Sequence, residues 1–225
     1  MFGAALQPDG KIVLVGDADA RVAVARLNPN GSLDTSFSRD GKKLFSWGAF
    51  SRATAVLVLP TGKLLLVGFS GPEGGNIQVA RLNPRGALDA TFGSGGKVAV
   101  EFGGDDFGHA IARLKPDGSS DAAFDGDGTA TLDFGSLADL AFAALLQPDG
   151  KIVVAGSTQA TGDFAVARLN PDGSPDMTFG AAGKATADFG AAAFAFAMAL
   201  QPDGRIVVAG QRTGADDFAI ARLLG

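Results

Sequence analysis

The feature that most constrains this chain is a short segment in which two apolar runs flank a turn. Its fullest form reads LLQPDGKIVVAG over Leu145–Gly156. Pro148 pre-sets the backbone angle that opens a β-turn, and Gly150 can take the left-handed conformation that closes it. The apolar runs are rich in strand formers, and we expect Gly156 to end the second one. The segment therefore predicts a β-hairpin.

The chain repeats this hairpin, and a second motif follows it. The other copies of the hairpin lie at Leu6–Gly16, Leu59–Gly68 and Leu200–Gly210. The second motif contains Ala-Arg-Leu, and its five arginines are Arg26, Arg81, Arg113, Arg168 and Arg222. These arginines are separated by 55, 32, 55 and 54 residues. Fixed spacing of this kind indicates an array of structural repeats.

Each full repeat contains four strand-like runs. In the second repeat we expect strands at Ala53–Leu59, Lys63–Val67, Asn76–Leu82 and Lys97–Phe102. Four antiparallel strands per repeat are typical of a β-propeller blade, although ~40–50 residues per blade is more usual. The sequence thus predicts an all-β fold with one β-propeller domain over residues 1–225. We expect five unequal blades, at about residues 1–48, 49–103, 104–135, 136–190 and 191–225.

The 32-residue interval predicts a truncated third blade. Relative to the 55-residue spacing, 23 residues are missing, which is the length of two strands with their connections. We expect this blade to keep two strands, Phe107–Leu114 and Thr129–Phe134. The last blade has three strands, of which Phe218–Leu223 is the third, and lacks a fourth. Both ends of the chain fall inside a repeat, so we expect a fragment of a larger protein.

One run tests the choice between helix and strand. The segment that begins at Gly190 reads GAAAFAFAMAL and is rich in alanine, which favours helices. However, Phe194, Phe196, Met198 and Leu200 alternate strictly with alanines. A period of two residues is the signature of a strand, so we predict the first strand of the last blade here.

Composition and charge exclude several classes of protein. The net charge is −5 and the basic residues are dispersed, which argues against a nucleic-acid partner. The absence of cysteine excludes disulfides and thiolate metal sites. The longest apolar run, Ala191–Leu200, is too short to span a bilayer. Because Met1-Phe2-Gly3 leads directly into the first repeat, we expect no signal peptide in this sequence.

The motifs LQPDGKIVVAG, DFAVARLNPDGS and GKATADFG resemble the delta-60 repeat, a β-propeller-type family, over essentially the whole chain. The resemblance implies a fold and no known activity. It also implies a bacterial protein that is secreted or exposed at the cell surface. The truncated third repeat departs from the family pattern.

Four of the repeated arginines are each followed eight residues later by an aspartate. The pairs are Arg26 and Asp34, Arg81 and Asp89, Arg113 and Asp121, and Arg168 and Asp176. A ring of functional charges is one interpretation. We favour structural ion pairs within each blade, because a partly buried arginine needs a fixed partner.

The remaining candidates for chemistry are few. The loop Asp125–Gly128 contains alternating aspartates but fails the EF-hand template, so we interpret it as a turn and expect no metal site. His109 is the only histidine and has no nucleophile near it in sequence. We expect packing rather than catalysis, no catalytic residue and no cofactor.

An aromatic and basic departure from the repeat surrounds the only tryptophan. It comprises Phe45, Trp47, Phe50 and Arg52, and we group it with His109 as a possible interaction patch. Aromatic and arginine side chains are enriched at binding hot spots. Filling of the core of an end blade is the alternative that we favour.

The sequence predicts a non-enzymatic scaffold or interaction module with an unidentified protein or carbohydrate partner. One alternative is a sugar- or surface-binding module that uses variable loop residues: Glu73, Asn76, Gln78, Gln211 and Arg212. Another is a hydrolase or lyase in a central channel, but the first strands offer apolar residues there. We also expect self-association through an unpaired edge strand, Asp217–Leu224.

Overall fold

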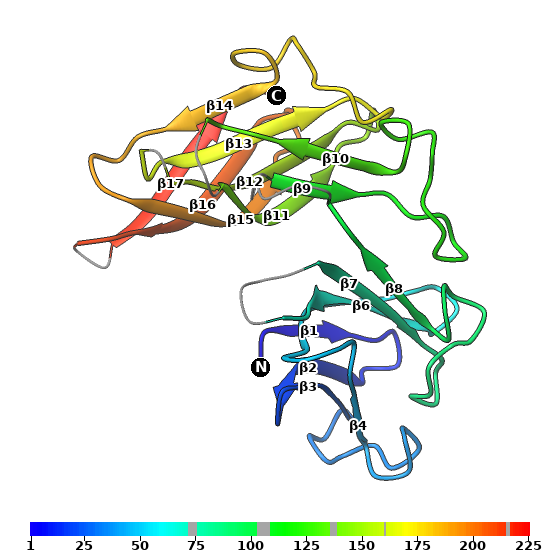
Figure 1. Cartoon of the computed structure of the whole chain (residues 1–225). Coiled ribbons are helices and arrows are strands. Elements are labelled where there is room, and N and C mark those ends of the chain that lie inside the picture. Colours follow the sequence, from blue (N-terminus) through cyan, green and yellow to red (C-terminus); the bar gives the residue numbers. More distant parts are fainter. Residues whose placement is uncertain (72–75, 103–108, 136–138, 160, 215–216) are drawn as a thin grey trace. The chain divides into compact units, whose positions relative to one another are not determined.

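In the part of the chain that the computed structural model describes, all elements are β-strands, and they form antiparallel sheets in chain order (Figure 1). The structure describes residues 1–71, 76–102, 109–135, 139–159, 161–214 and 217–225. The part of the chain before the 32-residue interval forms two four-stranded sheets. The first sheet comprises β1 (Gly3–Leu6), β2 (Ile12–Ala18), β3 (Arg21–Leu27) and β4 (Lys42–Phe45). The second sheet comprises β5 (Arg52–Val58), β6 (Leu64–Phe69), β7 (Ile77–Leu82) and β8 (Lys97–Val100).

The rest of the chain forms three sheets of unequal size in the described residues. The third sheet has two strands, β9 (His109–Ala112) and β10 (Thr129–Leu132). The fourth sheet comprises β11 (Asp139–Leu146), β12 (Ile152–Thr158), β13 (Phe164–Leu169) and β14 (Lys184–Ala187). The fifth sheet comprises β15 (Ala193–Leu200), β16 (Ile206–Arg212) and β17 (Asp217–Leu223). The all-β prediction is thus confirmed; of the predicted third-blade strand, Phe107 and Gly108 lie outside the described residues.

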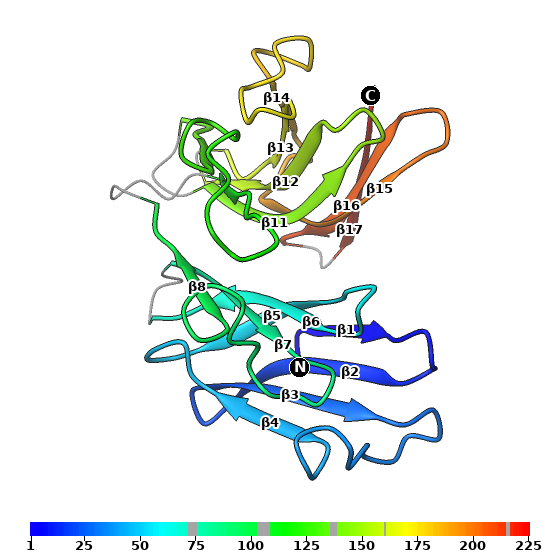
Figure 2. The ribbon, with the colours of Figure 1, turned by 90° about the vertical axis from the view of Figure 1, so that its right-hand side faces the viewer.

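The chain divides into two compact units. Unit 1 contains Met1–Glu101 and the turn Leu114–Ser119; unit 2 contains Phe102–Arg113 and Ser120–Gly225. In unit 1 the four strands of the first sheet follow one another in order across the sheet (Figure 2). Whether both units act as the single domain expected from the repeats stays a prediction.

The repeated hairpins owe their register to the turn residues. In the first hairpin Gly10 has φ +81° and donates its N–H to the Gln7 carbonyl at 2.9 Å. The Asp9 carboxylate accepts from the Lys11 N–H at 3.2 Å, which caps the turn. The same arrangement occurs at Gly150 and Gly204. The Pro-Asp-Gly motif therefore sets the pairing of the first two strands in these repeats.

A β-bulge interrupts the first strand of each of three sheets. The pairing skips one residue at Thr54, at Phe142 and at Phe196. In β15 the buried residues before the bulge are Ala193 and Ala195, whereas after it Met198 and Leu200 pack against the core. The segment is a strand, as its period predicts. The strict alternation does not keep one side of it buried, because the extra residue reverses the two faces.

The glycine that was expected to end the second strand lies inside it. β12 continues two residues beyond Gly156 to Thr158. A Cβ at Gly156 would lie 1.6 Å from the Leu140 carbonyl oxygen, and one at Gly210 would lie 1.8 Å from that of Phe194. These glycines are therefore required by the close approach of the bulged strand, and the prediction that Gly156 ends the run is wrong.

Successive sheets bury their apolar faces against each other within each unit. In unit 1 one cluster joins Val13, Val15, Val22 and Val24 of the first sheet to Leu64, Leu66, Ala80 and Leu82 of the second. In unit 2 one cluster joins the third and fourth sheets, and another joins the fourth and fifth. The fourth sheet therefore has two different apolar faces, one covered by the third sheet and one covered by the fifth.

We predict that amide exchange is faster in β9 and β10 than in β12 and β13. A two-stranded sheet has few neighbours to protect its backbone hydrogen bonds, and an isolated two-stranded hairpin is marginally stable at best. Hydrogen–deuterium exchange with peptide-level or NMR detection measures this difference. Equal protection in both pairs would mean that packing against the fourth sheet compensates fully for the missing strands.

Candidate functional site

The repeated arginines and aspartates form ion pairs in all four repeats where both occur. In each pair the arginine Nε donates to the aspartate Oδ2 at 2.7 Å. The arginine projects from the third strand of its sheet, or from the end of β9 in the third. The aspartate lies in the loop that follows. A side-chain hydrogen bond thus closes the eight-residue separation that the sequence shows.

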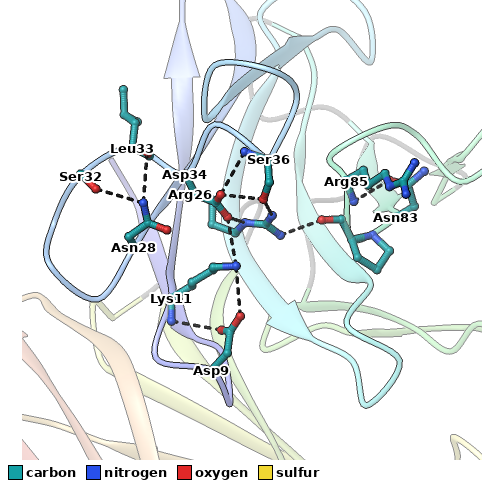
Figure 3. Close-up of polar contacts among 11 residues, drawn as sticks. Asp9, Lys11, Arg26, Asn28, Ser32, Leu33, Asp34, Ser36, Asn83 and Arg85 are labelled. Atoms are coloured by element: carbon teal, nitrogen blue, oxygen red, sulfur yellow. Dashed lines mark hydrogen bonds and ion pairs between the residues drawn. The ribbon is translucent and has the colours of Figure 1, made fainter.

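Each aspartate of the full repeats receives further hydrogen bonds that saturate its carboxylate. For Asp34 the Ser36 hydroxyl donates at 2.6 Å and Lys11 Nζ lies at 3.4 Å (Figure 3). Thr91 and Lys63 surround Asp89 in the same way, and Thr178 and Lys151 surround Asp176. The lysine comes from the Pro-Asp-Gly or Pro-Thr-Gly hairpin of the same repeat. The cluster therefore joins the hairpin, the third strand and the loop.

These hydrogen bonds hold the carboxylates in their charged form. The Ser36 hydroxyl is the largest cause that holds the pKa of Asp34 well below its usual value of 3.8. The Lys63 ammonium has the leading role in lowering the pKa of Asp89, and the Thr178 hydroxyl in lowering that of Asp176. The paired arginine lowers the pKa of each of them further. Donation to the charged form stabilises it relative to the neutral acid.

The pair in the truncated third repeat is less complete. The deletion removed the hairpin that supplies the lysine, and Ala123 stands where the other repeats have serine or threonine. The Arg113 and Asp121 side chains are 32% and 25% exposed. The other six side chains of these pairs are at most 10% exposed. The third pair is therefore the natural internal control for the others.

A phenylalanine lies beneath every paired arginine. The guanidinium carbon is 4.7–4.9 Å from the ring centroid of Phe37, Phe92, Phe124 or Phe179. All four rings are buried. A desolvated guanidinium over an aromatic face gains a cation–π attraction. Our sequence interpretation missed these rings, although phenylalanine follows each of the four arginines at a constant eleven residues.

Three of these clusters also reach into the next repeat. Arg26 Nη1 donates to the Pro84 carbonyl at 2.7 Å. Pro84 lies in a turn between Asn83 and Arg85, which are labelled in Figure 3. Arg81 donates likewise to Pro116, and Arg113 to Pro171. We call the arginine, aspartate and phenylalanine of one repeat, with the turn they contact in the next, the inter-sheet latch. The sequence predicted the ion pair within a blade, and the structure adds a contact between the same arginine and the next repeat.

The turn glycine of the next repeat packs directly on the latch phenylalanine. A Cβ at Gly86 would lie 2.9 Å from the Phe37 ring, and one at Gly118 would lie 2.9 Å from the Phe92 ring. Both glycines also have positive φ. In addition, the Ser38 N–H donates to the Arg85 carbonyl at 2.8 Å. The latch therefore fixes the spacing of neighbouring sheets through backbone groups as well as through charge.

A lysine makes a second link between repeats. Lys97 Nζ donates to the Ser46 carbonyl at 2.7 Å and lies 5.9 Å from the centroid of Phe45. Lys184 makes the same two contacts with Asp133 and Phe134. Both lysines occupy the first position of a fourth strand. Several of the charged side chains that recur in the repeats thus also connect one repeat with another.

The residues of the predicted interaction patch have different environments. Phe45 is buried and meets Trp47 edge to face at 5.6 Å, and both pack in the core cluster of unit 1. Phe50 is 60% exposed. Arg52 lies over the Phe2 ring and pairs with Asp17 at 3.2 Å. Core filling therefore describes Phe45 and Trp47, and only Phe50 offers an exposed aromatic surface.

His109 belongs to unit 2 and is fully buried. Its ring lies 4.9 Å from that of Phe134, and neither ring nitrogen makes a hydrogen bond among the described residues. Burial lowers the pKa of His109, and the nearby Asp139 carboxylate opposes this effect. A neutral, enclosed imidazole is suited to packing and is inaccessible to a substrate from solvent.

The aspartate-rich loop of the third repeat makes internal hydrogen bonds. Asp127 accepts from the Thr129 N–H and hydroxyl, each at 2.7 Å, and the Asp125 N–H donates to the Asp172 carbonyl at 2.6 Å. In the described part of the chain, no three histidine or acidic residues converge in a way that could hold a metal. The same residues include no helix that could cross a bilayer.

Comparison with known protein families identifies the family of this fold. Residues 7–37, 59–92, 147–179 and 201–225 match the family described as "Domain of unknown function (DUF5122) beta-propeller". These segments cover more than half of the chain, so the chain belongs to this β-propeller family. Each matched segment begins at or near a repeated hairpin and includes an Ala-Arg-Leu motif; the truncated third repeat lies outside them.

Two solved structures resemble the chain distantly. One is a protein from Lactobacillus plantarum, with a TM-score of 0.44, 12% identity, and coverage of 99% of this chain and 70% of that one. The other is a GH43 endo-arabinanase from Bacillus licheniformis, with a TM-score of 0.39, 10% identity, and coverage of 98% and 92%. Comparison with proteins of curated function found no match. Neither structural likeness is close enough to support an inference about activity.

We predict that Asp176→Ala destabilises the protein by about 3 kcal/mol, because it leaves Arg168 buried without its counter-charge. The matched change Asp121→Ala should cost only about 1 kcal/mol, because that pair is partly exposed to water. Urea denaturation of the two variants and the parent measures both values. Equal costs would show that burial of the ion pair does not decide its contribution to stability.

We also predict acid lability below about pH 4. A folded-state pKa below the unfolded value of 3.8 gives stability that is complete above pH 3.8 and is lost as pH falls further. His109 adds a separate loss that begins below its unfolded value of 6.5. Thermal melts from pH 7 to pH 2.5 should resolve both steps. Asp34→Asn should flatten the lower step; an unchanged slope would contradict this assignment.

Proposed function

We propose that the chain is a non-enzymatic β-propeller module of the delta-60 type, with five unequal blades, that acts as a scaffold or interaction domain. Two features of its charged residues support this. Four of the recurring arginines are paired with aspartates, three of these arginines also contact the next repeat, and two lysines link neighbouring repeats. The exposed positions of the fifth sheet include three large apolar side chains, Phe196, Phe218 and Ile220. We infer a protein or carbohydrate partner, and an extracellular or cell-surface location.

The single observation that carries the proposal is the open edge of β17. Among the described residues, β17 pairs only with β16, and its other edge has no partner strand. The strand reads DFAIARL and has no proline or inward-pointing lysine to block pairing. Natural edge strands usually carry such protection, and an unprotected edge can accept a strand from a partner by β-augmentation.

An aromatic cluster supports a second candidate, a sugar-binding module. Phe142 and Phe196, the bulged residues of β11 and β15, have ring centroids 5.2 Å apart and are 43% and 49% exposed. Phe194 stacks parallel to Phe196 at 6.3 Å. Exposed aromatic faces can stack on the apolar face of a sugar ring. Of the variable residues considered earlier, Gln78 is buried, Asn76 is exposed, and Glu73 lies outside the described residues.

The open edge predicts binding of an added strand that copies the fourth strand of the preceding repeat. A peptide with the sequence of Lys184–Gly190 should bind, and amides of Phe218–Leu223 should become protected from hydrogen exchange. A scrambled peptide is the control. If neither peptide protects β17, the edge is not a binding site. Glycan binding that is lost in Phe142→Ala would then favour the sugar-binding candidate.

A further inference from the structure

A pocket lies between the hairpin turns of the fourth and fifth repeats. Its volume is about 430 Å³, which falls within the range of ~300–1,000 Å³ that is common for small-molecule sites. The lining residues are Gln147, Pro148 and Asp149 from the fourth repeat and Leu200, Gln201, Pro202 and Gly204 from the fifth. All of these residues belong to unit 2. The walls of the pocket therefore come from two consecutive repeats of one unit.

The strands that lead into the two turns lie side by side in unit 2 (Figure 1). β11 ends at Leu146 and β15 ends at Leu200, and each strand is followed directly by a glutamine. The rings of Phe142 and Phe196, which lie five residues before the two glutamines, have centroids 5.2 Å apart. The shared register of the repeats thus brings two glutamine side chains to the same pocket.

The backbone of each glutamine is already used by its own turn. The Gln147 N–H donates to the Lys151 carbonyl at 2.8 Å, and the Gln147 carbonyl accepts from the Gly150 N–H at 2.9 Å. Gln201 makes the same two hydrogen bonds in its own turn. The side-chain oxygen Oε1 of each glutamine, in contrast, is buried and has no hydrogen-bond partner among the described residues. Because an unpaired buried acceptor is unfavourable, these amides are suited to a bound molecule that supplies a donor.

The lining offers the groups that recognise a neutral polyol. Each glutamine amide contains a donor and an acceptor, as a hydroxyl group does. The Asp149 carboxylate accepts from the Lys151 N–H at 3.1 Å and keeps further acceptor capacity. Asp149 is also the one charged residue of the lining, and Lys151 Nζ lies 3.9 Å from it, so the lining favours an uncharged ligand. Pro148, Pro202 and Leu200 add apolar surface on which the C–H face of a sugar ring can pack.

The glutamines are not needed to form the hairpin turn. In the second repeat Leu59 stands at the position that Gln7 has in the first. Its backbone nevertheless makes the same two hydrogen bonds, to the Lys63 carbonyl at 2.9 Å and from the Gly62 N–H at 2.8 Å. The neighbouring hairpins of unit 1 therefore have one amide where the fourth and fifth repeats have two. The pair of amides is a particular property of the pocket and not a requirement of the repeat.

We propose that this pocket binds one ring of a neutral carbohydrate. The sugar hydroxyls hydrogen-bond to Gln147, Gln201 and Asp149, and the apolar face of the ring packs on Pro148 and Pro202. The inference rests on the carbohydrate partner of the proposed function. It assigns that ligand to the turns at the ends of β11 and β15 and not to the exposed phenylalanines within these strands.

NMR titration of the isotope-labelled chain with D-glucose, D-galactose and D-mannose at millimolar concentration tests the proposal. At least one sugar should shift the side-chain amide signals of Gln147 and Gln201, whereas those of Gln7 should not move. Gln201→Leu introduces the residue that the second repeat has, and it should raise the apparent dissociation constant by at least about tenfold. Gln147→Leu is the second variant, with the same expected effect. Gln7→Leu is the matched control, because it makes the same change in a hairpin outside the pocket, and it should leave binding unchanged. Thermal melts confirm that each variant folds.

Three results would overturn the proposal. If none of the sugars shifts the signals of Gln147 and Gln201, the pocket is not a sugar site and the buried oxygens accept from water. If methylammonium shifts these signals at lower concentration than the sugars do, the pocket is a cation site. If sugar binding persists in Gln201→Leu and is lost in Phe142→Ala, the sugar lies on the exposed phenylalanines; that result rejects this inference and leaves the carbohydrate partner standing. Binding of the Lys184–Gly190 peptide without any sugar binding likewise rejects this inference alone and leaves the interaction function standing.

Discussion

The structure depends on buried guanidinium groups that must be satisfied on every side. Arginine is suited to this role because its planar fork presents five donors in fixed directions. In the first repeat Arg26 Nε donates to Asp34, its Nη1 donates to the Pro84 carbonyl, and the flat face of the guanidinium packs on Phe37. A lysine could make only one of these contacts well. The latch therefore links charge neutralisation within a repeat to the position of the next repeat.

The aspartate completes this arrangement because it is held by more than its arginine. A buried ion pair alone returns little net stability after desolvation. Here the carboxylate also accepts from a hydroxyl and lies beside a lysine, so its acceptor capacity is used. The third repeat shows the alternative: without the lysine and the hydroxyl, Arg113 and Asp121 are several-fold more exposed. The loss of one hairpin thus leaves the arginine–aspartate pair of the same repeat more exposed to solvent.

Much of the fold could be predicted from local patterns. The Pro-Asp-Gly turns, the period of two in Ala193–Leu200 and the 32-residue interval each indicate local backbone geometry, and that geometry is observed. The inter-sheet contacts could not be predicted in this way, because spacing along the chain does not show which carbonyl faces Arg26. The bulge at Phe196 was also missed, since it depends on a glycine in the neighbouring strand. The phenylalanine of the latch was visible as a constant spacing and was overlooked.

The direction of the latch has a consequence for synthesis. Each arginine finds its carbonyl partner later in the chain, 58 residues away for Arg26 and 35 for Arg81. A ribosome builds the chain from the N-terminus, so a newly made repeat has its guanidinium in place before its acceptor turn exists. During translation a repeat that carries one of these three arginines lacks the acceptor until the repeat after it supplies the carbonyl. Because the third repeat is truncated, fewer residues must be synthesised before the acceptor of Arg81 is present.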